Sequence, residues 1–528
     1  MNVPLSVLEF RDRAAAYFAD RVGVVDGERC FTYREYADRT HRLASALRRL
    51  GVVPGDRVSY ITYNTHQLLE GYYGVLEAGA VLNPINIRLT PEDIAYILDH
   101  SASKVVLFHA DFAPLVERIA PGLANHPTFV AMEGEVREPA THEYESLLAA
   151  ASPDEPPAEM DENGVAELFY TSGTTGRPKG VALTHRALYL HGIQTALALG
   201  VTDADTILHV VPLFHVNGWG APHWMTLVGG QHVMLRRFDP AALMAQVERH
   251  RVTYLLAVPT IFNAVLDSPE FGNYDLSSLR RVLVGGAPSS PALIRSLEER
   301  LGVEAVVGYG LSETSPVITI AWPRRHLLET EPPERRRERQ ATTGWATPGT
   351  RVRVVTGEGT DVEPNDEQIG EIVVRSNVVM DGYYGDPEGT AAVIRDGWFH
   401  TGDMATVDQQ GYITIKDRLK DVIISGGENI SSVEIEYALA EFPGLLEAAV
   451  VAAPDETWGE VPLAIIAMKP GTAATADDVI AFCRQRLAAF KVPKRVEFVD
   501  QLPKGGTGKI LKGALREPFW RGYEKRVH

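Results

Sequence analysis

The stretch YTSGTTGRPKG (Tyr170–Gly180) combines three glycines, four Ser or Thr hydroxyls, an arginine and a lysine. It follows the apolar run VAELF (Val165–Phe169), which predicts a buried strand, and leads toward a helix that begins near His185. Glycines let the backbone approach a ligand and turn its N–H groups inward, while hydroxyl and cationic side chains suit phosphate oxygens. We therefore predict a polyphosphate-binding loop, with a flexible surface loop as the alternative.

This loop does not fit the Walker pattern of P-loop proteins. That pattern requires a glycine, four residues and then Gly-Lys-Ser/Thr. Counting from Gly173, Pro178 stands where the second glycine belongs, and Lys179 is followed by Gly180 instead of Ser or Thr. The sequence therefore indicates a phosphate loop of another class.

The overall composition is that of an ordinary globular protein. The chain has 528 residues, of which 45% are hydrophobic and 23% are charged. Its net charge of −18 argues against nucleic acid or an anionic membrane as a partner, because both require a basic surface. Two cysteines cannot form a disulfide framework, and no apolar run reaches the ~18 residues of a membrane span. We expect a cytoplasmic protein without a membrane span.

Apolar strand-like runs alternate with amphipathic stretches along the chain, which predicts an α/β fold with mostly parallel strands. Residues 91–100 are expected to form a helix capped by Thr90, with Pro91 in its first turn. The run SKVVLF (Ser103–Phe108) predicts the next strand.

The pattern becomes more compact after Arg418, so we predict a large domain over residues 1–418 and a small one over residues 419–528. In the small domain, Ser431 is expected to cap a helix and to form a capping box with Glu434. A second helix is predicted over residues 475–490.

Further polar and aromatic residues follow apolar runs elsewhere in the chain. Tyr309 lies between two glycines and precedes Ser312 and Glu313, Asp403 ends GWFHTGD, and Lys509 lies in a glycine-rich turn. Each has a simple structural explanation when taken alone. Together they provide an aromatic face for a base, a carboxylate for ribose hydroxyls and a carboxylate for Mg²⁺. The set predicts a nucleotide site.

The order of these motifs resembles that of a known superfamily, the adenylate-forming acyl-CoA synthetases. The shared motifs are YTSGTTGRPKG, YGLSE, GWFHTGD, DRLKD followed by SGGENISSVEIE, and PKGGTGK. The superfamily includes fatty-acyl-CoA and 4-coumarate–CoA ligases, luciferases and the adenylation domains of peptide synthetases. The resemblance implies an α/β enzyme with a large adenylation domain of several subdomains and a small mobile α+β domain. It also implies Mg²⁺ as cofactor and ATP, CoA and a carboxylic acid as substrates.

The resemblance further implies a role for individual residues. Its implied ATP-binding residues are Thr171, Ser172, Gly173, Thr174, Thr175, Lys179, Gly286, Ala287, Gly308, Tyr309, Gly310, Ser312, Asp403, Arg418 and Lys420. The implied metal residues are Thr174 and Glu313, and the implied catalytic residues are Lys509, Glu313 and His215. Val216, Trp219, Gly220 and Leu311 would line the acyl pocket. Ser425, Gly426 and Gly427 would face CoA, and Lys420 would be the hinge between the domains.

The acid is less well defined by these residues. Peptide-synthetase domains that activate α-amino acids usually carry an aspartate at the position of His215, so an α-amino acid is disfavoured. FHVNGW resembles the fatty-acyl branch, which favours a medium- to long-chain fatty acid. An aryl or alicyclic acid, a carrier-protein acceptor, a luciferase-like oxygenase and a non-catalytic nucleotide-binding protein stay open as alternatives. Gly505 replaces a threonine common in relatives, and a homodimer is compatible with the sequence.

Overall fold

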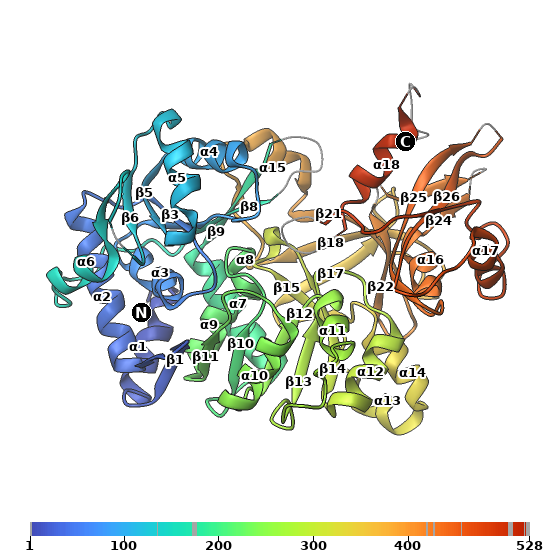
Figure 1. The fold of residues 1–528 in the computed structure, drawn as a ribbon, viewed down its shortest axis with the longest axis horizontal. Coiled ribbons are helices and arrows are strands. Elements are labelled where there is room, and N and C mark those ends of the chain that lie inside the picture. Colours follow the sequence, from blue (N-terminus) through green and yellow to red (C-terminus); the bar gives the residue numbers. More distant parts are fainter. Residues whose placement is uncertain are drawn as a thin grey trace.

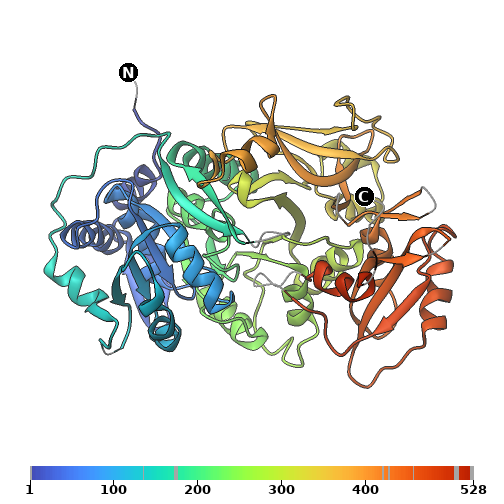
Figure 2. The same cartoon turned by 90° about the horizontal axis from the view of Figure 1, so that it is seen from above.

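The computed structural model describes residues 3–134, 136–171, 177–418, 421–425, 428–455, 457–504, 510–521 and 523. Within these residues the strands form four sheets, and helices cover the faces of the larger ones (Figure 1). The last of the four sheets, with its own helices, lies at one end of the molecule (Figures 1 and 2).

The first large sheet has a parallel centre and antiparallel edges. Its strands, in spatial order, are β16 (Trp345–Ala346), β15 (Val317–Ile320), β14 (Glu304–Gly310), β13 (Arg281–Val284), β12 (Tyr254–Ala257), β10 (Thr206–His209), β11 (Gln231–Met234), β1 (Val22–Asp26) and β2 (Arg29–Thr32).

The second large sheet also has a parallel centre, but only one of its edges is antiparallel, and that edge carries the glycine-rich stretch. Its strands, in spatial order, are β19 (Gly382–Tyr383), β9 (Lys179–Thr184), β8 (Val165–Thr171), β4 (Val81–Pro84), β3 (Arg57–Ile61), β5 (Ser103–Phe108), β6 (Thr128–Ala131) and β7 (Ala140–Glu143).

The remaining two sheets are mainly antiparallel. The third contains β17 (Thr350–Val355), β18 (Gly370–Ser376), β20 (Ile394–Arg395), β21 (Trp398–Val407) and β22 (Ile413–Arg418). The fourth contains β23 (Ile423–Ser425), β24 (Glu428–Ile430), β25 (Leu445–Asp455), β26 (Gly459–Met468) and β27 (Arg495–Phe498). The expected parallel pairing is therefore confirmed for the two large sheets only.

The helices of the first half are α1 (Leu8–Tyr17), α2 (Tyr33–Arg49), α3 (His66–Glu77), α4 (Pro91–His100), α5 (Ala113–Ile119), α6 (Tyr144–Ala150), α7 (His185–Leu199), α8 (Val216–Trp219), α9 (Ala221–Val228) and α10 (Pro240–His250). Those of the second half are α11 (Pro259–Leu266), α12 (Pro291–Leu301), α13 (Arg325–Thr330), α14 (Pro333–Gln340), α15 (Pro387–Val393), α16 (Ser432–Leu439), α17 (Ala476–Arg484) and α18 (Lys512–Trp520). Short 3₁₀ turns are η1 (Ala110–Phe112), η2 (Ala120–Gly122) and η3 (Ser312–Thr314).

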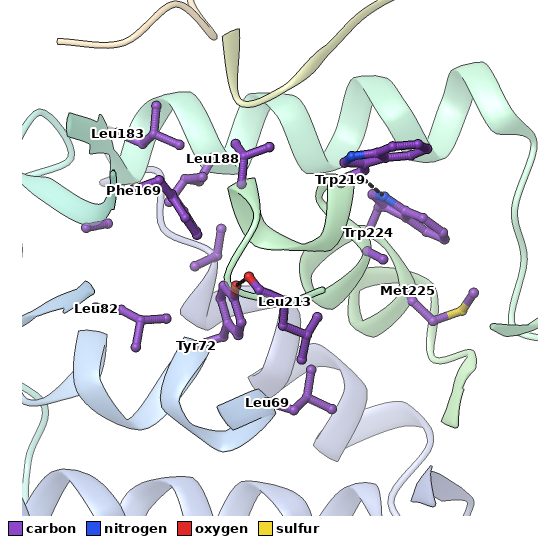
Figure 3. Packing of buried hydrophobic residues seen from close by; sticks show 14 of the residues in the cluster. Leu69, Tyr72, Leu82, Phe169, Leu183, Leu188, Leu213, Trp219, Trp224 and Met225 are labelled. Atoms are coloured by element: carbon purple, nitrogen blue, oxygen red, sulfur yellow. Dashed lines mark hydrogen bonds between the residues drawn. The ribbon is translucent and has the colours of Figure 1, made fainter. Parts of the chain in front are cut away.

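The main core packs side chains of both large sheets against α3, α7 and α9. Figure 3 shows part of this core, where Leu82, Phe169 and Leu183 of the second large sheet lie near α3 and α7. Tyr72 and Trp224 are completely buried in it, and each donates its polar hydrogen to a backbone carbonyl, of Leu213 at 2.6 Å and of Trp219 at 3.2 Å. Burying a large apolar side chain stabilises the fold by about 1.5–3 kcal/mol. The core thereby fixes the segment that contains Trp219 relative to both sheets.

Several local predictions are confirmed, and two need correction. The strand Val165–Phe169, the strand Ser103–Phe108 and the helix after Thr90 are present, and the Thr90 hydroxyl accepts the Asp93 N–H at 3.1 Å.

The predicted capping box of Ser431 is only half formed. Ser431 accepts the Glu434 N–H at 3.1 Å, but the Glu434 carboxylate pairs with Lys491 at 2.7 Å instead of returning to the cap. The helix predicted over 475–490 ends at Arg484, because the chain must turn to bring Lys491 to Glu434 and to bury Val492.

Candidate active site

The flanks of the glycine-rich loop are held opposite each other by the sheet. Thr171 ends β8 and Lys179 begins β9, and the two residues are direct partners in the antiparallel register. The Lys179 ammonium lies 2.9 Å from a carboxylate oxygen of Asp386 and 4.8 Å from the ring centre of Tyr383. The other predicted ligands of this loop, Ser172, Gly173, Thr174 and Thr175, lie outside the described residues.

Glu313 lies in η3, directly after the strand that carries Tyr309. Its Oε1 accepts a hydrogen bond from the Tyr383 hydroxyl at 2.9 Å. Burial, and then the charge of Glu313, raises the pKa of Tyr383, so this phenol stays protonated and donates. Tyr383 thus connects Glu313 with Lys179, although the two are far apart in the sequence.

A second polar group joins Tyr309, Asp403 and Arg418. Asp403 and Arg418 are direct cross-strand partners on β21 and β22, a pairing that places opposite charges side by side. Arg418 Nε lies 3.2 Å from Asp403 Oδ1, and the Tyr309 hydroxyl donates to Asp403 Oδ2 at 2.7 Å. The charge of Asp403 is the main reason that the pKa of Arg418 is raised. The structure therefore brings three predicted nucleotide-binding residues together.

Glycines allow the backbone around Tyr309 to pack closely. A Cβ atom on Gly310 would lie 1.8 Å from the Pro316 carbonyl oxygen, and one on Gly308 would lie 3.0 Å from the Leu283 side chain. Only glycine fits at Gly310 without a backbone shift. Gly286 and Ala287, also predicted to bind ATP, follow β13, and Gly286 has a φ of +74°.

The predicted acyl wall is built on a left-handed turn. Val216, Asn217, Gly218 and Trp219 have φ values of 31°, 43°, 51° and 61°, and Gly220 follows at 80°. Each non-glycine residue in this conformation costs about 1–2 kcal/mol, so packing must hold the turn in place. His215 precedes the turn, and its N–H donates to the Pro212 carbonyl at 2.9 Å.

Three of the four predicted acyl-wall residues are buried: Val216 is 3% and Trp219 is 6% exposed, and Gly220 is buried as well. A Cβ atom on Gly285 would lie only 3.0 Å from the Trp219 indole, so this ring packs against the turn that contains Gly286. Leu311 is half-buried against the same core. Apolar side chains therefore adjoin the candidate nucleotide site.

Of the predicted CoA face, Ser425 lies in the fourth sheet. Ser425 ends β23 and pairs with Gly459 at the start of β26. Gly426, Gly427, Lys420 and Lys509 lie outside the described residues, so their predicted roles rest on the sequence.

Two residues near the site were missed by the motif analysis, namely Tyr383 and Asp386. They lie in DGYYGDP, where β19 pairs with β9 beside Lys179. The hydrogen bond from Lys179 is the largest cause of the lowered pKa of Asp386, which keeps this carboxylate charged. The segment DGYYGDP contains two tyrosines, two glycines and two aspartates, and this composition was the only sequence signal for a functional role. Nothing in the segment indicated that it pairs with β9.

The described residues fit a magnesium ion that is held mainly by its substrate. Within the described ranges, no three His, Cys, Asp or Glu side chains converge as a metal-binding group. Mg²⁺ with a nucleotide usually takes only one or two protein carboxylates, together with phosphate oxygens and water. Glu313, whose carboxylate accepts a hydrogen bond from Tyr383, would fit as such a carboxylate.

In the part of the chain that the structure describes, no helix combines the length and apolar character needed to cross a bilayer.

Comparison with known proteins agrees with this geometry over nearly the whole chain. Residues 10–384 match the family model of the AMP-binding enzymes, and residues 434–509 match that of the AMP-binding enzyme C-terminal domain. A long-chain-fatty-acid–CoA ligase from Thermus thermophilus is 40% identical over 99% of this chain and 97% of its own length. A feruloyl-CoA synthase from Amycolatopsis is 39% identical over 96% of this chain and 98% of its own.

Among solved structures, an anthranilate CoA ligase in complex with anthranoyl-AMP superimposes with a TM-score of 0.90 at 25% identity, over 98% of both chains. The fold and the site thus define an adenylate-forming enzyme with a large N-terminal and a small C-terminal domain. The chain belongs to the AMP-binding enzyme family, within the acyl-CoA synthetase superfamily. It is accordingly an AMP-forming acid–thiol ligase.

Proposed function

We propose that this enzyme activates a medium- to long-chain fatty acid as acyl-AMP and transfers the acyl group to CoA, with release of AMP and pyrophosphate. The observation that carries the proposal is the contact between the Trp219 indole and Gly285. It joins a buried apolar wall to the turn beside the candidate adenine site. Apolar walls with a few polar groups suit an alkyl chain whose carboxylate must meet the nucleotide.

In this proposal the nucleotide is held by groups from several elements. Tyr309 stacks on adenine beside Gly286 and Ala287, with Gly308 and Gly310 leaving room for the backbone. Asp403 and Arg418 bind the ribose, which displaces the Tyr309 hydroxyl from Asp403. Thr171 and Lys179 bind phosphate oxygens together with the loop between them, and Ser312 contacts the α-phosphate.

The chemistry requires positive charge near the α-phosphate, because a carboxylate and a triphosphate repel each other. Mg²⁺, held by Glu313 and Thr174, would neutralise charge on the phosphates when bound. Lys509 would stabilise charge on the α-phosphate and the substrate carboxylate during adenylation. His215 would lie beside the nascent adenylate, and Val216, Trp219, Gly220 and Leu311 would keep water away from it.

Thioester formation needs a different face of the small domain. We propose that residues 419–528 rotate relative to residues 1–418 about Lys420, which brings Ser425, Gly426 and Gly427 toward CoA. A cytoplasmic location and a homodimer are further parts of this proposal. Cell fractionation and light scattering of the purified protein test them.

The acid is tested by measuring pyrophosphate release with ATP and Mg²⁺ for straight-chain, branched, aryl and amino acids, each with and without CoA. We expect activity to peak on medium or long alkyl chains and turnover to require CoA. A peak on aryl acids would instead support the second candidate, which the similarity to the feruloyl-CoA synthase favours. Acid-dependent release that is indifferent to CoA would contradict CoA as the acceptor.

The ribose assignment predicts a selective defect in Asp403→Asn. Loss of a charged acceptor for a hydroxyl should raise the KM for ATP by about tenfold or more, while the KM for the acid changes little. Asp361→Asn is the matched control, because Asp361 also pairs with an arginine, Arg353, at 2.6 Å but lies outside the site. Equal KM values for ATP in both variants would refute the role of Asp403.

A further inference from the structure

A buried carboxylate lies beneath the left-handed turn of the proposed acyl wall. Glu167 on β8 accepts a hydrogen bond from the Asn217 side-chain amide at 3.0 Å, and its other oxygen lies 2.7 Å from His223 Nε2. All three side chains have zero exposure. Neither Glu167 nor His223 belongs to the site described above, and burying a carboxylate is unfavourable unless its partners compensate.

The hydrogen bond to Glu167 comes from a residue of the turn whose backbone conformation is unfavourable. Asn217 has a φ of 43° and lies between Val216 and Gly218, which are also left-handed. The Asn217 amide oxygen has no hydrogen-bond partner among the described residues. The hydrogen bond from its amide nitrogen to Glu167 is therefore the one polar contact that holds this side chain in the described structure. Losing Glu167 would leave this buried amide without any partner.

The other carboxylate oxygen of Glu167 faces His223, which is itself tightly packed. His223 on α9 is enclosed by the rings of Tyr72 and Tyr73, whose centres lie 5.6 Å and 5.9 Å from it in edge-on geometry. The hydroxyls of these tyrosines donate to the carbonyls of Leu213 and Pro222, on the two sides of the turn. Figure 3 shows Tyr72 reaching Leu213 below Trp219. His223 is therefore fixed by its neighbours, and it holds the second carboxylate oxygen of Glu167 in a defined position.

We propose that Glu167 is a positioning residue that sets acid specificity by holding the Val216–Trp219 turn, and with it the Trp219 indole, against Gly285. Glu167 lies on the strand that enters the glycine-rich loop, so the turn is placed relative to that loop as well. This inference rests on the proposed function for its link to the acid, but the placement of Trp219 can be measured without any substrate.

The substrate-free test measures acrylamide quenching of Trp219 fluorescence, taken as the difference between each protein and its Trp219→Phe counterpart. Trp219 is 6% exposed, so it should be poorly quenched in the wild type. In Glu167→Leu we expect quenching of this component to rise at least about twofold, since the turn loses the buried hydrogen bond that holds its Asn217 side chain. Glu167→Gln should behave as the wild type, because its amide can still bond to both partners. Unchanged quenching in Glu167→Leu would overturn the inference whatever the enzyme's activity.

The kinetic test compares KM and kcat with acids of increasing chain length. Glu167→Leu should raise the KM for the preferred acid about tenfold and flatten the chain-length profile, with the KM for ATP unchanged within about twofold. Adding Asn217→Gly to Glu167→Leu should restore the acid KM, because glycine adopts a left-handed φ without cost. A purely structural role for Glu167 predicts no such rescue.

Asn217→Ala covers the case in which Glu167→Leu does not fold. It removes the contact with the turn but keeps the pair between Glu167 and His223. The same rise in Trp219 quenching and in acid KM is expected, and wild-type values for both would overturn the inference. Failure of the proposed function would show differently, as a wild-type enzyme without acid-dependent pyrophosphate release.

Discussion

Lys509→Ala is expected to lower the rate of acyl-AMP formation by about 10²–10³-fold, the usual loss when one group that stabilises transition-state charge is removed. Two negatively charged groups meet in this step, so a missing ammonium at the α-phosphate affects the transition state more than substrate binding. Thioester formation from supplied acyl-AMP and CoA should change less than about twofold, because no charge develops on a departing pyrophosphate in that step. The measurement is ATP–pyrophosphate exchange compared with CoA consumption from the supplied adenylate.

Lys504→Ala is the matched control for this variant. Lys504 lies in the same PKGGTGK motif, but its ammonium forms an ion pair with Glu447 on β25. Its loss removes one positive charge from the same segment without removing a group assigned to the reaction, so both half-reactions should persist. If Lys504→Ala and Lys509→Ala lower exchange equally, the general charge of the segment matters and the specific role of Lys509 is wrong. Equal loss of both half-reactions in Lys509→Ala would also contradict that role.

Much of the fold could be predicted because its signals are local. The strand Ser103–Phe108 contains the apolar run Val105–Phe108, and the helix after Thr90 is defined by its cap and by Pro91 in the first turn. Two features differ from the prediction for the same reason: the helix that ends early at Arg484, and the half-formed capping box at Ser431. Lys491 competes for Glu434, and no pattern within the helix itself reveals that contact.

The sequence indicated the residues of the candidate site but not how they are arranged. Motif order indicated Tyr309, Asp403 and Arg418, and the structure shows them bonded to one another. Tyr383 was missed because its role depends on β19 pairing with β9, a contact between distant segments.

The left-handed turn was also beyond sequence reasoning. Positive φ at Val216 and Trp219 opposes their intrinsic preference, and only the tertiary contacts of Asn217 and its neighbours account for it. Departures of this kind are typical of functional sites.

Lys420→Pro is expected to lower thioester formation from supplied acyl-AMP by about a hundredfold and to spare ATP–pyrophosphate exchange, because proline fixes φ at a residue that must rotate. The anchored neighbours of Lys420 explain why the rotation is assigned to this position. Before it, Arg418 is paired with Asp403 in the third sheet. After it, Asp421 forms a 2.8 Å ion pair with Arg516 on α18. If the two domains rotate as proposed, we expect the backbone rotation between these anchors.

The proposed rotation would also break a contact that crosses this segment. The buried Asp417 carboxylate accepts the Ser432 N–H at 2.8 Å, and the pKa of Asp417 is raised by its burial. Within the small domain, Lys512 on α18 forms a 2.8 Å ion pair with Glu436 that this rotation would leave intact, and neighbouring carboxylates raise the pKa of Lys512 in spite of its burial. Since α18 directly follows the segment with Lys509, the small domain should move with that lysine as one body. Lys420→Ala keeps the backbone free and should retain both half-reactions. If Lys420→Pro also retains both, the domains do not rotate about this residue.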